Sequence, residues 1–153
     1  GFRVGNTLSE SGTVSRGICE TNEKQLLTSV VERTKIQRMD GEVKYIDDNG
    51  EWVSTPETTP VSMNFWGFTP DYFQYSQDFF KVFLSDPTNM ENLKSEFFIP
   101  LMVDKLINDG TATVEVLDTT SVWFGVTYAA DRDATVERIA KLVADGVYPN
   151  KLF

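Results

Sequence analysis

The chain has 153 residues, of which 41% are apolar and 24% charged, and its 14 basic and 23 acidic residues give a net charge of −9. This composition is typical of a globular domain, and the acidic balance argues against binding to nucleic acid or to anionic membranes. The lack of histidine and the single cysteine, Cys19, exclude Ser-His-Asp and Cys-His catalysis and the zinc sites built on those ligands. We expect a cytoplasmic protein whose chemistry rests on carboxylates, cationic side chains, hydroxyls, backbone amides or a hard metal ion.

The first half of the chain has the pattern of strands joined by turns. Apolar residues that alternate or are β-branched predict strands at residues 2–4, 14–19, 26–36, 44–46, 51–53 and 61–68. Asn49-Gly50 is the strongest hairpin signal, and the acidic run before it lacks the spacing of a calcium-binding loop.

The second half changes to a helical period. Helices are predicted after Thr69-Pro70, from Ser95-Glu96 to Gly110, and over residues 131–145. Strands are predicted at residues 111–117 and 122–128, so the order indicates an α/β or α+β domain. No glycine-rich loop is followed by the lysine that binds a triphosphate.

A charged cluster follows the apolar part of the third predicted strand. Glu32, Arg33 and Lys35 place a carboxylate beside two cations. The carboxylate could accept hydrogen bonds from sugar hydroxyls while the cations bind a phosphate. The alternative is a solvated strand end, since such charge runs are common on protein surfaces.

Three glycines interrupt predicted strands. Gly17 indicates either a β-bulge or a place where a ligand approaches the backbone. Gly67 follows Asn64 in one aromatic strand, and Gly125 follows Trp123 in another. Each signal is weak alone, because aromatic residues in strands are more often core than ligand platforms.

Together, these segments resemble the C-terminal half of a sugar-1-phosphate nucleotidyltransferase of the glucose-1-phosphate uridylyltransferase or thymidylyltransferase type. The resemblance rests on Gly17-Ile18-Cys19-Glu20, the run from Leu27 to Thr34, Asn64-Phe65-Trp66-Gly67-Phe68, Ser95-Glu96-Phe97-Phe98-Ile99-Pro100 and Trp123-Phe124-Gly125-Val126-Thr127. These segments follow one another in the family's order along nearly the whole chain. The family's glycine-rich nucleotide loop belongs to the N-terminal half, which we expect to be absent from this truncated domain.

The resemblance implies a Rossmann-like α/β fold, a mixed sheet flanked by helices, with residues 1–153 as a single acceptor-binding portion. It implies that the intact enzyme transfers a nucleotidyl group from a nucleoside triphosphate to a sugar phosphate, with Mg²⁺ assistance and release of pyrophosphate, and that the isolated chain is inactive. It implies substrate-binding roles for Gly17, Glu32, Arg33, Lys35, Asn64, Gly67 and Trp123. Gly125 stands where many members carry a metal-binding aspartate, so the metal ligands are not assigned.

Two other interpretations remain open. Trp52, Trp66 and Trp123 are compatible with a carbohydrate-binding module that does not catalyse. Gly125 is compatible with a regulatory pseudo-enzyme that keeps the fold and has lost the metal. A homo-oligomer is possible under each interpretation.

Overall fold

The computed structural model describes residues 1–9, 12–126, 129 and 131–151. The chain forms two compact units, Gly1–Ser121 and Val122–Phe153, and each is described by itself. The first unit contains a six-stranded sheet with α1, α2 and α3, and the second contains α4.

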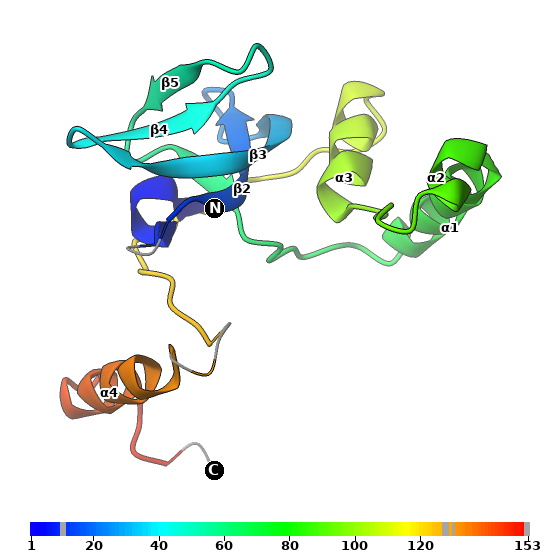
Figure 1. The fold of residues 1–153 in the computed structure, drawn as a ribbon. Helices are drawn as coiled ribbons and strands as arrows, with labels where there is room; N and C mark the ends of the chain where they lie inside the picture. The colour runs from blue at the N-terminus through cyan, green and yellow to red at the C-terminus, as the bar shows by residue number, and fades with distance from the viewer. Residues whose placement is uncertain (10–11, 127–128, 130, 152–153) are drawn as a thin grey trace. The chain divides into compact units, whose positions relative to one another are not determined.

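The sheet has the strand order β1-β6-β2-β3-β4-β5 (Figure 1). Its strands are β1 (Phe2–Arg3), β2 (Val14–Thr21), β3 (Leu27–Met39), β4 (Glu42–Ile46), β5 (Trp52–Thr55) and β6 (Pro60–Ser62). The pairings between these strands are antiparallel, and an isolated bridge between Phe2 and Thr119 is parallel.

Two tight turns set the register of the β3–β4–β5 meander. Asp40 and Gly41 have φ angles of 53° and 83°, so both central residues have the positive φ of a type I′ hairpin. In the next turn the Asp47 carboxylate accepts hydrogen bonds from the backbone N–H groups of Asn49 and Glu51, at 2.9 Å each. These bonds hold the pKa of Asp47 below its usual range.

The sheet has a core on each face. One cluster contains Val4, Ile36, Val43 and Val61, with Ile18 packed against it. The other contains Cys19, Leu27, Val30 and Val103 of α3. Ile18 and Cys19 are neighbours on β2, so the two clusters lie on opposite faces of the pleated sheet.

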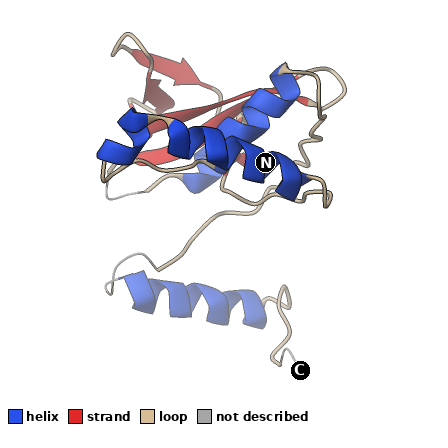
Figure 2. Ribbon diagram, turned by 90° about the vertical axis from the view of Figure 1, so that its right-hand side faces the viewer, coloured by secondary structure: helices blue, strands red, loops and turns tan. Residues whose placement is uncertain are grey.

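The helices of the first unit are α1 (Tyr72–Ser85), α2 (Pro87–Glu91) and α3 (Ile99–Asn108), and a 3₁₀ helix, η1 (Val4–Thr7), follows β1. Figure 2, turned by 90°, shows the helices of this unit in front of the strands. The Asp104 carboxylate on α3 accepts a hydrogen bond from the backbone N–H of Val30 at 3.2 Å, which attaches α3 to β3. In the second unit, α4 spans Asp131–Ala144.

Several predicted elements are confirmed, with shifted ends. Strands β1 to β5 and helices α1 and α4 are where the sequence pattern places them, and Gly110 and Gly146, with φ of 70° and 75°, follow α3 and α4. The expectation of an α/β class is confirmed in its coarse form, as a mixed helix-and-strand structure around an antiparallel sheet. None of the described helices is long and apolar enough to cross a membrane.

Other predicted boundaries are wrong. The strand expected at residues 61–68 ends at Ser62, because Asn64 has a φ of 55° and leaves the extended conformation. Residues 111–117 form a single bridge to Leu26 rather than a strand. Residues 122–126 carry no strand, and Thr127 and Tyr128, the rest of that prediction, lie outside the described residues. The second predicted helix begins at Ile99 rather than at Ser95.

Candidate functional site

Gly17 and Glu32 are register partners at the centre of the β2–β3 pair. Gly17 also pairs with Ser62 of β6, so it lies between two neighbouring strands. A Cβ added at Gly17 would lie 3.1 Å from Val30 Cγ2, 3.3 Å from Ser62 Cβ and 3.5 Å from Glu32 Oε2. Gly17 is not at either irregularity of the β2–β3 register, so its place reflects a close approach of neighbouring side chains rather than a bulge.

The Glu32 carboxylate has an unusual environment for a surface residue. Although its side chain still meets solvent, packing around the carboxyl raises its pKa, and the positive charge of Arg16 opposes that shift. Arg16 donates from Nη2 to the backbone oxygen of Thr7 at 2.6 Å, and burial lowers its own pKa. A partly desolvated carboxylate binds hydroxyl donors more strongly than one in bulk water, because fewer water molecules compete for it.

Arg33 lies on the opposite face of the sheet from Glu32. Its guanidinium forms an ion pair with Asp48 at 2.5 Å and lies 5.2 Å from the centre of the Tyr45 ring. Tyr45 packs against the core cluster of Ile36 and Val43. The structure therefore separates the two residues that the sequence places side by side, and Arg33 connects β3 to β4 and the turn that follows it.

A cavity lies next to Ser62, one of the residues that contact Gly17. Its volume of about 600 Å³ is within the usual range for small-molecule sites. Its walls come from the start of β1, the β2–β3 core, β6 with the residues after it, and the segment 114–119. The lining residues are Gly1, Phe2, Cys19, Leu27, Val61, Ser62, Met63, Phe65, Trp66, Gly67 and residues 114–119. Gly17 and Glu32 are not among the described lining residues; Ser62 connects them to the cavity, because it belongs both to the lining and to the contacts around Gly17.

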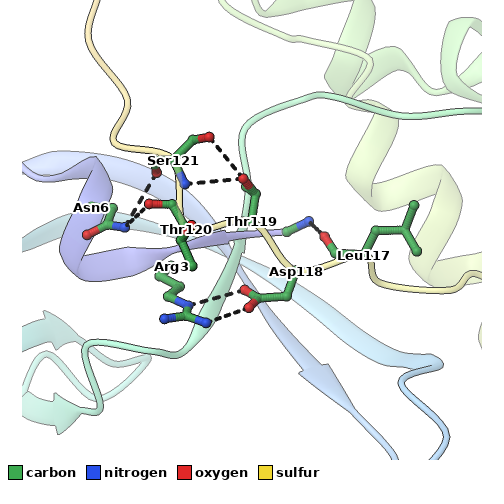
Figure 3. Close-up of polar contacts among 8 residues, drawn as sticks. Arg3, Asn6, Leu117, Asp118, Thr119, Thr120 and Ser121 are labelled. Carbon is green, nitrogen blue, oxygen red and sulfur yellow. Dashed lines mark hydrogen bonds and ion pairs between the residues drawn. The ribbon is translucent and has the colours of Figure 1, made fainter. Parts of the chain in front are cut away.

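The wall formed by residues 114–119 is attached at both ends. Val116 donates its N–H to Gln25 and Leu27 donates its N–H to Val114, at 2.8 Å each. At the other end Arg3 pairs with Asp118 at 2.6 Å, and Asn6 donates to the Thr120 oxygen at 3.0 Å (Figure 3). The hydrogen bond from Arg3 holds the pKa of Asp118 below its usual range.

The remaining predicted site residues are dispersed. Gly67 lines the cavity, and an added Cβ there would meet no atom within 4 Å. Asn64 is exposed and donates its backbone N–H to Ser62 Oγ at 3.2 Å. Lys35 is exposed on β3. Trp123 belongs to the second unit, where its ring lies 3.1 Å from the position of an added Cβ at Gly125.

Sequence reasoning missed parts of the cavity wall. Ser62, Glu115 and Asp118 have no motif around them, and their roles follow from strand register and from contacts between residues more than a hundred positions apart. Cys19 belongs to the first of the segments that carry the family resemblance, and the structure makes it a buried residue of the cavity wall. Burial raises the pKa of its thiol to about 11.

The described side chains do not fit a resident metal. No three aspartate, glutamate or cysteine side chains come together as ligands in the part of the chain that the structure describes. At Gly125, the space next to the backbone is occupied by the Trp123 ring. We therefore derive no step through Mg²⁺ from these residues.

No protein-family model matches the chain, and no curated protein matches it.

Proposed function

We propose that this chain is the acceptor-binding portion of a sugar-1-phosphate nucleotidyltransferase with a Rossmann-like fold. The observation that carries the proposal is the position of the Glu32 carboxylate, 3.5 Å from where a side chain on Gly17 would begin and beside the Ser62 wall of the cavity. A partly desolvated carboxylate next to a cavity suits the binding of a polyhydroxyl ring, while Gly17 itself is buried among Val30, Ser62 and Glu32.

In this proposal the sugar ring occupies the cavity mouth. Glu32 accepts hydrogen bonds from two neighbouring hydroxyls, and the missing side chain at Gly17 leaves space for the Glu32 carboxylate beside β2. Apolar and aromatic residues, including Trp66, supply the surface on which the ring's C–H face packs. Gly67, without a side chain, keeps the entrance wide.

The phosphate of the acceptor lies outside the cavity in this arrangement. The charged side chains among the described lining residues are Glu115 and Asp118, the second paired with Arg3, so the lining side chains supply no cation for a phosphate. Arg33 is held by Asp48 and Tyr45 on the other face, so we leave it out of the proposed site. The nucleoside triphosphate and the metal ion would then be bound by a nucleotide-binding half that this chain does not supply, and the isolated chain would release no pyrophosphate.

A carbohydrate-binding module is the second candidate, favoured by exposed aromatic side chains, one of which lines the cavity. Phe65, which lines the cavity, is 92% exposed. Trp52 and Trp123 are each 38% exposed, and Trp66 is half-buried. A module of this kind would bind free sugars and phosphorylated sugars alike.

Titration of the chain with glucose 1-phosphate, glucose and inorganic phosphate tests the proposal, with tryptophan fluorescence as the readout, since Trp66 lines the cavity. We expect saturable binding of glucose 1-phosphate that Glu32→Gln weakens by about 10- to 100-fold, the effect of one charge-assisted hydrogen bond. Glu20→Gln, which neutralises an exposed carboxylate on β2, is the matched control and should leave binding unchanged. Equal binding of glucose would favour the carbohydrate-binding module, and binding that is insensitive to Glu32→Gln would contradict the assigned pocket.

A further inference from the structure

The apolar surface of the first unit is divided unequally between the sheet and the helices. Among the described residues from 1 to 62, the exposed large apolar side chains are Val31 and Trp52, at 39% and 38%. The segment of α1, α2 and α3 exposes many more. Six of these define what we call the helical face: Phe73 (73%), Phe80 (44%), Leu84 (43%), Leu93 (100%), Phe98 (50%) and Leu101 (63%).

The six side chains of the helical face together expose more apolar area than the largest patch of a typical monomer. With about 200 Å² for a fully exposed large side chain, these exposed fractions amount to about 700 Å² of apolar surface. The largest apolar patch on a typical monomer is about 300–600 Å². Helix α1 packs against the residues that precede α3. The ring centres of Phe80 and Phe83 on α1 lie 5.3 Å and 5.5 Å from the ring centre of Phe97.

Helix α1 presents a seam suited to packing against another helix. Leu84 and Phe80 follow Phe73 by eleven and seven residues, which places all three within about 20° of one direction around the helix. Val82 follows Phe73 by nine residues and points to the opposite side. None of the residues of α1 is buried within the unit, so the seam stays largely exposed although the Phe80 ring contacts Phe97.

The charges of α1 permit a second copy to approach. The whole chain carries −9, so two copies repel each other over most of their surface. On α1 the charged residues are Asp78 and Lys81, which pair with each other at 2.9 Å, so the helix has no net charge. The exposed apolar side chains of α1 therefore lie on a helix whose own charges do not repel a second copy.

We propose that the helical face is the interface of a homodimer of this chain, with the two α1 helices packed about a two-fold axis. Two copies would remove about 1,400 Å² of apolar surface from water, within the range of about 1,200–2,000 Å² for stable interfaces. A two-fold axis presents the same face on both chains and closes the assembly at two copies. The proposal is independent of the ligand assigned to the cavity.

Sedimentation equilibrium of the 153-residue chain tests the proposal. We expect a species of twice 17.3 kDa at about 10 μM, with tighter association at high salt because salt screens the repulsion between the chains. Phe73→Gln and Leu84→Gln should each raise the dissociation constant at least about 10-fold, whereas Val82→Gln, the matched control on the same helix, should leave it within about two-fold.

Three results would overturn the proposal. The first is a monomer at about 100 μM, which would mean that a different chain covers the face. The second is growth beyond two copies with concentration, which two-fold closure forbids. The third is equal weakening by Val82→Gln. Far-UV circular dichroism of each variant establishes that the helices are intact, and Leu84→Gln provides the test if Phe73→Gln unfolds.

Discussion

Replacement of Gly17 by alanine is the most informative perturbation of the proposed site. The new Cβ would lie 3.1 Å from Val30 Cγ2 and 3.3 Å from Ser62 Cβ, so both neighbours must move by a few tenths of an ångström. Val30 is 6% exposed and belongs to the core beneath α3, so it has little room to move.

The expected loss of stability is about 1 kcal/mol. Overpacking a core position costs about 1–3 kcal/mol. Alanine recovers about 0.4–1 kcal/mol of that loss, because it restricts the unfolded chain more than glycine does. The same methyl group narrows the space beside Glu32, so glucose 1-phosphate should bind more weakly as well.

Urea denaturation followed by tryptophan fluorescence measures the first effect, and the titration measures the second. For stability alone, Gly67→Ala is the matched control, because an added Cβ at that position meets no atom within 4 Å and φ is not positive there. Gly67→Ala should leave stability unchanged or raise it by a few tenths of a kcal/mol, about the entropic gain of such a substitution. A Gly17→Ala protein that is more stable than the parent, or that binds the ligand equally well, would refute the packing argument.

Three further predictions follow from the charged and titratable groups. Glu32→Gln should raise the urea midpoint at pH 7 while it weakens ligand binding. The folded state raises the pKa of Glu32, so this residue favours folding below its unfolded pKa and loses that contribution as pH rises through its folded pKa. A fall in the midpoint would contradict this. Arg33→Ala should lower stability by about 1 kcal/mol, because the contacts of Arg33 with Asp48 and Tyr45 are lost. The same variant should bind glucose 1-phosphate with an affinity within about two-fold of the parent. A large loss of affinity would place Arg33 in the binding site after all. Cys19, with a pKa of about 11, should react with iodoacetamide at pH 8 roughly 100-fold more slowly than a free cysteine. The stability of the parent relative to Cys19→Ala should fall by about 2–3 kcal/mol between pH 9 and 11, because only the unfolded thiol ionises in that range. Equal pH profiles for the two proteins would contradict the burial of the thiol.

The parts of the fold that depend on local pattern were predictable from sequence. Strands β2 and β3 follow alternation and β-branching, and the turn after β4 follows Asn49-Gly50. The turn at Asp40-Gly41 has an equally strong signal that could have been used. Helix α2 was also within reach, because Asp86 before Pro87 is a capping signal and the Asp86 carboxylate accepts from Thr88 N–H at 2.9 Å.

The parts that depend on distant contacts were not predictable in this way. Sequence adjacency suggested that Glu32 and Arg33 act together, but neighbours on a strand point to opposite faces, and the fixed partners of Arg33 lie on β4 and in the turn that follows it. Residues 111–117 have a strand pattern, yet their backbone hydrogen bonds go to different places: Thr111 and Ala112 bond to Leu106 of α3, whereas Val114 and Val116 bond to Leu27 and Gln25, at and just before the start of β3. Ser62 enters the site through its register with Gly17, which no local motif encodes.

The central claim is that a sugar ring binds at the cavity beside Gly17 and Glu32. The most direct test is to follow the backbone amide signals of the chain by nuclear magnetic resonance during a titration with glucose 1-phosphate. The account predicts that the largest shifts fall on Gly17, Ser62 and Gly67, with small shifts at Tyr45 and Asp48. Shifts concentrated around Arg33, Tyr45 and Asp48, with the amides of Gly17 and Ser62 unchanged, would contradict it.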